Sequence, residues 1–267
     1  MGRIHAQKLA ARGDVSFDIV DPPKGHPDRG GALPDFAIVA TPTITHAAVA
    51  LPLLRAGVPC LIEKPLADTL ENARQLAAFP HVSVGHVERH NPTLVPIQQA
   101  GCSPRFLQAE RLSPYQRRGT DVDVIADLMI HDIDLALWLL GGAVKDVRAV
   151  GVGVMTGGAD IVNARVELEG GIATLTASRV SHRPARSLRL VEPGCYWSAD
   201  LRSRTLHRVR WGEQDLTPEP IPVPSLDAIE CEQNAFLAAV RGEADYPCPG
   251  ADAVAAIALA EQIRRAL

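Results

Sequence analysis

An alternation of short apolar runs with helical patterns between residues 36 and 87 constrains the fold of this chain more than any other feature. Residues 36–40 are continuously apolar, which is typical of a strand covered on both faces. The pattern then predicts, in order, a helix at 45–56, a strand at 60–62, a helix at 68–78 capped by Asp68, and a strand at 82–87. Because the links are short, the strands must be parallel and joined by right-handed crossovers. The segment therefore predicts half of a doubly wound α/β domain.

The residues before this series predict a helix at 2–12 and a short buried strand at 15–20. The stretch 22–34 is rich in proline and glycine and is expected to be a loop. These elements extend the parallel domain to the start of the chain.

A different pattern begins after Asn91 and Pro92. A long helix is expected at 121–140, followed by strand-like runs at 144–154, 160–168, 171–180, 186–191 and 196–210, and by helices at 225–241 and 251–266. Consecutive strands joined by tight turns indicate an open, mostly antiparallel sheet. We therefore expect a parallel α/β domain over 1–90 and an α+β domain over 91–267.

The overall composition excludes several classes of protein. The 267 residues carry 27 basic and 31 acidic side chains, so the net charge of −4 argues against binding to nucleic acid through phosphate contacts. No apolar run approaches the roughly 18 residues that a membrane span requires. The five cysteines are scattered, without metal or redox spacing, which favours reduced thiols and a cytoplasmic location.

Polar residues follow the predicted parallel strands at their carboxyl ends, where open α/β sheets bind ligands. Asp21 follows the first of these strands and would accept the ribose hydroxyls of an adenosine, which favours NAD over NADP; alternatively it only begins the Asp-Pro-Pro turn. Glu63 and Lys64 follow a strand in the interior of the sheet, where two charges are costly unless they meet a ligand or each other. A lysine there would lower the pKa of a substrate hydroxyl. The alternative is a Glu–Lys surface pair at the edge of the sheet.

A stripe of polar residues marks the predicted long helix. Asp123, Asp127, His131 and Asp134 recur at helical spacing, while the other faces of the helix are apolar. A histidine one turn from an aspartate suits a general base whose partner orients it and stabilises its cation. Asp127, His131 and Asp134 are capable of binding a metal, but no second histidine or cysteine stands at ligand spacing and Lys64 would repel a cation, so we expect no metal.

Taken together, these motifs resemble those of the Gfo/Idh/MocA oxidoreductases, which include glucose–fructose oxidoreductase and inositol dehydrogenase. The resemblance spans most of the chain and is carried by Ala40-Thr41-Pro42 with His46, by Glu63-Lys64-Pro65, and by Asp127 with His131 and Asp132. It implies an N-terminal Rossmann domain that binds NAD or NADP, and a C-terminal domain whose open sheet forms a homo-dimer or homo-tetramer.

The resemblance also implies a role for individual residues. Lys64 would lie at the nicotinamide and the substrate, His131 would accept the proton, and Asp127 would be oriented beside it. The cofactor contacts implied are those of Gly2, Asp21, Thr41, Pro42, His46, Glu63 and Lys64.

Two segments, 85–92 and 127–134, are most similar to the branch of the family that oxidises the 3-hydroxyl of UDP-N-acetylglucosamine or its uronate. This similarity assigns Arg89 and Asn91 to the substrate. Arg117 and Arg118, just before the long helix, would meet a diphosphate. Two solvated loop arginines are an equally good interpretation of the latter pair.

The chain departs from the family pattern at its N-terminus. The family begins with a strand and a glycine-rich turn, of which Gly2 matches only the last glycine. Either roughly 8–12 residues, a strand and a turn, lie upstream of this start, or the cofactor site is compromised. Two alternatives to a sugar dehydrogenase therefore stay open. One is a non-catalytic relative with impaired cofactor binding, and the other is a reductase of a non-sugar carbonyl or ring compound.

Overall fold

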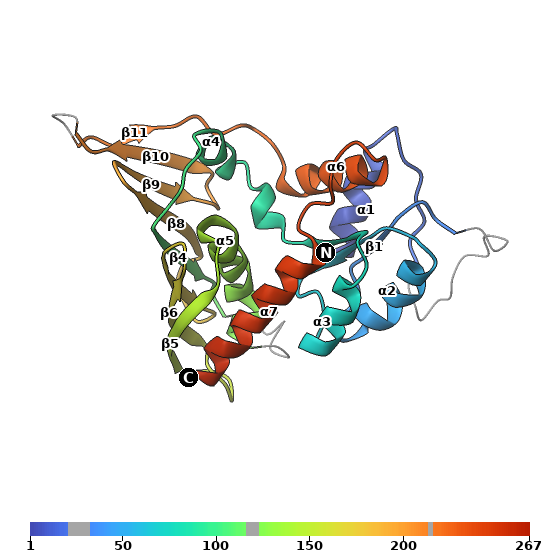
Figure 1. Cartoon of the computed structure of the whole chain (residues 1–267), viewed down its shortest axis with the longest axis horizontal. Helices are drawn as coiled ribbons and strands as arrows, with labels where there is room; N and C mark the ends of the chain where they lie inside the picture. The colour runs from blue at the N-terminus through green and yellow to red at the C-terminus, as the bar shows by residue number, and fades with distance from the viewer. Residues whose placement is uncertain (21–32, 116–122, 213–215) are drawn as a thin grey trace. The chain divides into compact units, whose positions relative to one another are not determined.

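A computed structural model describes residues 1–20, 33–115, 123–212 and 216–267 (Figure 1). The chain forms two compact units. The first contains Met1–Val87 and Asp227–Val254, and the second contains Glu88–Leu226 and Ala255–Leu267. The first crossing between the units lies close to the expected boundary at residue 90. The return of 227–254 to the first unit was not expected, because nothing local in a sequence shows which remote element a helix packs against.

The first unit is built on a parallel sheet of three strands in the order β1 (Ala37–Val39), β2 (Cys60–Glu63) and β3 (Val82–Gly85). Every residue of β2 and β3 is buried, as expected for strands covered on both faces. The free side of β3 is bridged by Ser83 to Pro249. The parallel pairing of β1 with β2 and of β2 with β3 confirms the expected arrangement.

Four helices accompany this sheet: α1 (Gly2–Ala10), α2 (His46–Arg55), α3 (Leu70–Ala77) and α6 (Ala228–Val240). Helix α1 contacts β1 and α6, and α2 contacts α3 and β2 (Figure 1). Thr69, rather than the expected Asp68, caps α3, since its side chain accepts from the amide of Asn72. Asp227 caps α6 in the same way.

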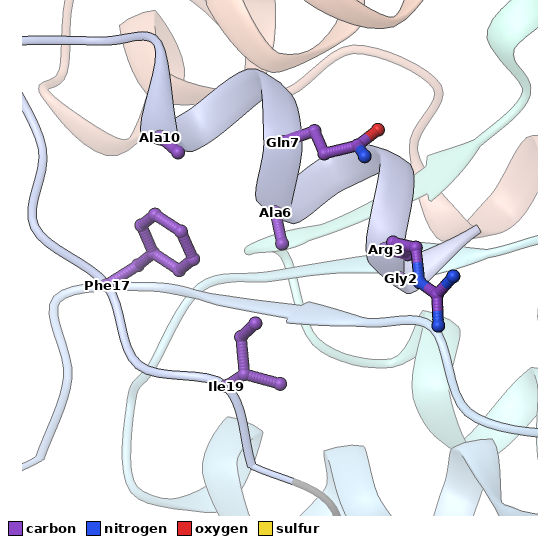
Figure 2. Close-up of a pocket in the computed structure, with 7 residues that line it drawn as sticks. All are labelled: Gly2, Arg3, Ala6, Gln7, Ala10, Phe17 and Ile19. Carbon is purple, nitrogen blue, oxygen red and sulfur yellow. The ribbon is translucent and has the colours of Figure 1, made fainter.

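The strand expected at 15–20 is absent from the structure: the segment forms no strand pairing and Ile19 is 73% exposed. Among the described residues, β1 pairs with β2 alone. A mostly apolar groove of about 450 Å³ separates α1 from this segment, with Ala6, Ala10, Phe17 and Ile19 among its lining residues (Figure 2). The described part of the sheet thus lacks the first strand of a Rossmann domain, as expected.

The second unit contains a sheet of eight strands in the order β11-β10-β9-β8-β4-β7-β6-β5. Their bounds are β4 Phe106–Leu112, β5 Val144–Val152, β6 Ile161–Leu168, β7 Ile172–Ser178, β8 Ala185–Glu192, β9 Cys195–Asp200, β10 Thr205–Arg210 and β11 Glu219–Pro220. All neighbours are antiparallel except β4 and β7. The run expected as one strand at 196–210 is two strands, and the central strand β4 was not expected at all.

Helix α5 (Ile130–Leu140) packs against β4 and β7 (Figure 1). A single π-helical turn, η4 (Ile125–Met129), precedes it. Of the helix expected at 121–140, the described residues 124–140 form one helical run that this turn makes irregular. Further helices are η3 (Val87–His90), α4 (Leu94–Gln99) and α7 (Gly250–Arg265). Helix α7 divides between the two units. The core gathers apolar residues of α4, α5, α7 and the sheet. In the described residues, no helix combines the length and apolarity needed to cross a membrane.

Candidate functional site

The start of α1 lies beside the carboxyl end of β1. A Cβ built on Gly2 would be 3.6 Å from the Cβ of Ala40, an ordinary contact. The first turn of α1 carries no acidic residue and its N-cap makes no side-chain hydrogen bond, so the positive end of the helix dipole can attract an anion. A helix N-terminus beside the end of a parallel strand suits the pyrophosphate of a dinucleotide. The first unit therefore fits NAD at this edge.

Two loops follow β1 and β2 at this same edge, and His46 joins them. Its Nε2 lies 2.9 Å from the carbonyl oxygen of Thr41, and its Nδ1 lies 3.1 Å from that of Pro65. The Thr41 hydroxyl accepts from the hydroxyl of Thr45 in the short helix η2 (Thr43–Thr45). The buried ring of His46 thus holds the loop of Thr41 and Pro42 against the loop that follows Lys64. Its expected contact with the cofactor stays a prediction.

Glu63 and Lys64 have different surroundings although they are adjacent. Glu63 is 6% exposed, and its Oε1 lies 2.7 Å from Nε2 of His5 on α1. Lys64 is half-buried and is joined to Pro65 by a cis peptide bond. Glu63 is therefore packed inside the first unit, which leaves Lys64 as the partly accessible charge at the end of β2.

The candidate base, His131, is half-buried in the first turn of α5, and Asp127 is half-buried in the π-helical turn before it. Single π-helical turns inside α-helices are frequent at functional sites. The four residues of the expected stripe do not share one environment. Asp123 accepts from Arg264 and from the amide of Ala126, while Asp134 is 1% exposed.

A buried ion cluster stands directly beside His131. Arg111 of β4 donates to Asp132 through Nη2 at 2.8 Å and Nε at 3.1 Å, and to Glu88 through Nη1 at 2.8 Å. These three residues are each about 4% exposed or less. The turn of α5 that carries His131 is therefore tied to the centre of the sheet and to the first residue of the second unit.

The register of the sheet brings two arginines together, and Glu88 stabilises this pair of like charges. Arg111 and Arg186 stand directly opposite each other on β4 and β8, where like charges destabilise a sheet. Oε1 of Glu88 accepts from both guanidinium groups. Burial raises the pKa of Glu88, but Arg111, Asn91 and Arg186 outweigh it and lower the pKa below its ordinary value. Burial raises the pKa of Asp132, which shares its partner Arg111 with Glu88.

A second ion pair fixes the residue after Glu88. Arg89 donates to both carboxylate oxygens of Asp134, at 2.9 and 2.6 Å, and its guanidinium lies 5.4 Å from the ring centre of Trp138. Asn91 is 6% exposed and donates to Glu88 and to the carbonyl of Leu201. The structure thus gives Arg89 and Asn91 partners inside the second unit, and their expected substrate contacts stay predictions.

Lys64 lies in the first unit and His131 in the second, so their expected convergence on one pocket stays a prediction. Asp21, Arg117 and Arg118 lie outside the described residues. Sequence reasoning missed Arg111, His5 and Glu232, all of them buried and charged or polar. The sequence shows that these residues are charged or polar, but their partners lie far away in the chain. Only their burial in the structure distinguishes them from ordinary surface side chains.

Two family models match the chain. Residues 6–80 match the oxidoreductase family with an NAD-binding Rossmann fold, and residues 102–191 match the GFO/IDH/MocA C-terminal domain. UDP-N-acetylglucosamine 3-dehydrogenase of Acidithiobacillus ferrooxidans is 36% identical over 294 aligned residues, which cover 100% of this chain and 94% of that protein. Inositol 2-dehydrogenase 2 of Saccharopolyspora erythraea is 35% identical over 43% of this chain and 38% of its own length.

Solved structures agree with these matches. The crystal form P21 of the A. ferrooxidans enzyme GnnA superimposes with a TM-score of 0.81 and 40% identity over 86% of this chain and 78% of that chain. A levoglucosan dehydrogenase in complex with NADH has a TM-score of 0.75 at 18% identity, over 86% of this chain and 76% of that one, and so shares the fold. The chain belongs to the Gfo/Idh/MocA family of NAD-dependent oxidoreductases that act on CH–OH groups.

Proposed function

We propose that this protein oxidises the 3-hydroxyl of UDP-N-acetylglucosamine, or of a closely similar sugar nucleotide, with NAD as hydride acceptor. One observation carries the proposal: the match to UDP-N-acetylglucosamine 3-dehydrogenase extends over the whole chain, whereas the match to inositol 2-dehydrogenase 2 covers 43% of it. A substrate assignment needs both the cofactor unit and the substrate unit, and the first relative matches both.

The proposed residue roles follow from position and chemistry. His131 accepts the proton of the sugar hydroxyl, with Asp127 beside it in the preceding turn. Lys64 stabilises the alkoxide that develops as this proton leaves. NAD, when bound, accepts the hydride at its nicotinamide ring. Asp132 does not serve as the base, since Arg111 binds it in the core.

The proposed dinucleotide site uses the edge where α1 begins and β1 and β2 end. The N-terminus of α1 at Gly2 faces the pyrophosphate, and Thr41, Pro42 and Glu63 line the strand ends. Asp21 accepts the ribose hydroxyls, which selects NAD over NADP. Binding is measured by titrating NADH and following its fluorescence; an otherwise folded chain that binds no NADH would support the non-catalytic alternative instead.

The activity test compares matched variants. Formation of NADH is followed at 340 nm with UDP-N-acetylglucosamine, with UDP-glucose and inositol as competing substrates. His131→Ala and Lys64→Met should each lower kcat by about 10²–10⁴, while the melting temperature stays near that of the parent. The exposed residues His207 and Lys145 provide the controls His207→Ala and Lys145→Met, which should leave kcat unchanged. Full activity in either site variant would end the assignment of that residue.

The protein is further proposed to act in the cytoplasm, as a homo-dimer or homo-tetramer assembled through the eight-stranded sheet. The five cysteines are free thiols, two of them buried, as expected in a reducing compartment. The edge strand β5 and the residues after it carry four aliphatic side chains that are each more than half exposed: Val150, Val152, Val154 and Met155. Contiguous exposed aliphatic residues suit an interface. Light scattering should show a multimer that Val152→Glu dissociates; a parent that is monomeric at micromolar concentration would exclude the interface.

A further inference from the structure

Two buried carboxylates and a histidine meet inside the first unit, and none of the three has a role in the proton transfer proposed above. His5 comes from α1, Glu63 from the end of β2 and Glu232 from α6, and they are 2%, 6% and 1% exposed. One ligand-type atom of each lies within 4.8 Å of the others. Among the described residues, this trio is the one group of its kind.

The hydrogen bonds of Gln233 determine which nitrogen of His5 carries the hydrogen. Nε2 of Gln233 lies 3.2 Å from the carbonyl oxygen of His5, which can only accept, so this end of the amide is the donor. The same atom lies 3.1 Å from Nδ1 of His5, which must therefore accept. The ring is then neutral, with its hydrogen on Nε2, and it donates to Oε1 of Glu63 at 2.7 Å.

Glu232 differs from Glu63 in its hydrogen bonding. Both of its carboxylate oxygens are buried, and neither makes a hydrogen bond with any residue that the structure describes. An ionised carboxylate in this buried position would lie close to the charge of Glu63, with a neutral histidine as the third member of the group, which is costly. We propose that His5, Glu63 and Glu232 form a buried proton-binding site in which Glu232 is held in its neutral, protonated form.

Within the described part of the chain, the other groups around the trio do not supply a compensating cation. Gln233 is a neutral amide, and β3 presents Gly85, where a Cβ would lie 3.3 Å from Oε1 of Glu63. Lys8 of α1 binds Glu230 at 2.9 Å and Asp227 at 3.2 Å at the exposed start of α6. In agreement with the geometry, burial and then the charge of Glu63 raise the pKa of Glu232 to about 8.

A divalent cation is the competing occupant, and the geometry disfavours it. A metal would need the lone pair on Nε2 of His5. That nitrogen carries the hydrogen that Glu63 accepts. A proton on Glu232 removes the repulsion between the carboxylates without disturbing this bond, so the site joins α1, β2 and α6 with one negative charge.

The direct test is a titration of the purified full chain labelled with ¹³C at the glutamate carboxyl carbons. Glu232→Gln identifies the Glu232 signal by its disappearance. We expect this signal to titrate near pH 8. A Glu232 signal that titrates near 4.5 would overturn the proposal. So would one equivalent of a bound divalent metal, measured by elemental analysis, that Glu232→Gln removes.

A stability measurement gives a second, independent outcome. A raised pKa in the folded state means that the fold binds one more proton than the unfolded chain between about pH 4.5 and 8, so stability falls as pH rises through this window. Glu232→Gln has no such proton. The opening equilibrium of α1 and α6, measured by hydrogen exchange, should therefore shift in the parent relative to Glu232→Gln by up to about tenfold per pH unit. Glu230→Gln should keep the pH dependence of the parent; identical profiles for the parent and Glu232→Gln would refute the site. If Glu232→Gln does not fold, a glutamate carboxyl signal of the folded parent that titrates near pH 8 still supports the site, and the lack of any such signal overturns it.

Discussion

Replacing Arg111 by Met removes the one guanidinium that two buried carboxylates share. Three charge-assisted hydrogen bonds are lost, two to Asp132 and one to Glu88. Each such bond is worth about 1.5–3 kcal/mol. The sum is an upper limit, because Glu88 keeps its contact with Arg186 and either carboxylate can take up a proton. We therefore expect Arg111→Met to cost about 3–5 kcal/mol, as for other buried ion pairs that lose one partner.

The three tryptophans report the unfolding of the second unit. Trp138, Trp197 and Trp211 all belong to that unit, so intrinsic fluorescence during unfolding reports its stability. At about 2–4 °C per kcal/mol for a domain of about 150–250 residues, the melting temperature should fall by roughly 6–20 °C. The control is Arg148→Met: its side chain is 78% exposed, and it should lose about 1 kcal/mol or less.

The pH dependence of Arg111→Met provides a further check on the reasoning. Without Arg111, burial favours the neutral forms of Glu88 and Asp132, so their pKa values in the folded variant rise above the ordinary range. The variant then loses stability as pH rises, and its deficit relative to the parent should shrink when the pH is lowered from 7 to 5. A loss no larger than that of Arg148→Met, or a deficit that is the same at pH 5 and 7, would refute the account of the cluster.

Two further predictions concern the loops of the second unit. A Cβ at Gly170 would lie 1.7 Å from the carbonyl oxygen of Leu140. Gly170→Ala should therefore destabilise the unit by about 3 kcal/mol or more in the same melting experiment. Gly157→Ala is the control and should be tolerated, because a Cβ there would have nothing within 4 Å. Burial raises the pKa of Asp160, but four donated hydrogen bonds outweigh it and hold the pKa well below its usual range. Asp160→Asn should therefore cost about 1–3 kcal/mol at pH 7, and unfolding curves should show this cost shrinking as the pH falls below about 4, where the parent loses the same contribution.

The parallel unit was predictable because its signal is local. Strands covered on both faces are continuously apolar, and the glycines and prolines between them mark the turns, so the segment from β1 to β3 follows from its own residues. The prediction of a strand at 15–20 was wrong because strand formation also depends on a partner elsewhere in the chain. A strand exists only with a partner, and no described residue pairs with that segment.

Strand β4 escaped prediction although it occupies the centre of the larger sheet. Its seven residues alternate between partly and fully buried, and they include Gln108, Glu110 and Arg111, which in isolation favour an exposed segment. The burial of Arg111 depends on Glu88 and Asp132, which lie 23 and 21 residues away in the chain. The same limit applies to His5 and Glu232, whose juxtaposition depends on the return of α6 to the first unit.

The candidate base was found from periodicity, although the assumption behind it was too simple. Spacing alone placed Asp123, Asp127, His131 and Asp134 together on one polar stripe of the helix. The structure binds Asp134 to Arg89 and Asp123 to Arg264, and a π-helical turn interrupts the regular spacing. A polar stripe on a buried helix therefore shows that partners exist, without showing whether they are ligands or other side chains.

The division of the chain between its units has a consequence for how the protein is made. The chain passes from the first unit to the second at Glu88, returns at Asp227 and leaves again at Ala255. The first unit therefore cannot be completed on the ribosome until α6 has been synthesised, and the second must wait for the last turns of α7. Neither unit corresponds to an excisable fragment, since cutting the chain at either early crossing removes a helix from its partner strands. Such late, long-range closure predicts slow folding in which both units become stable together.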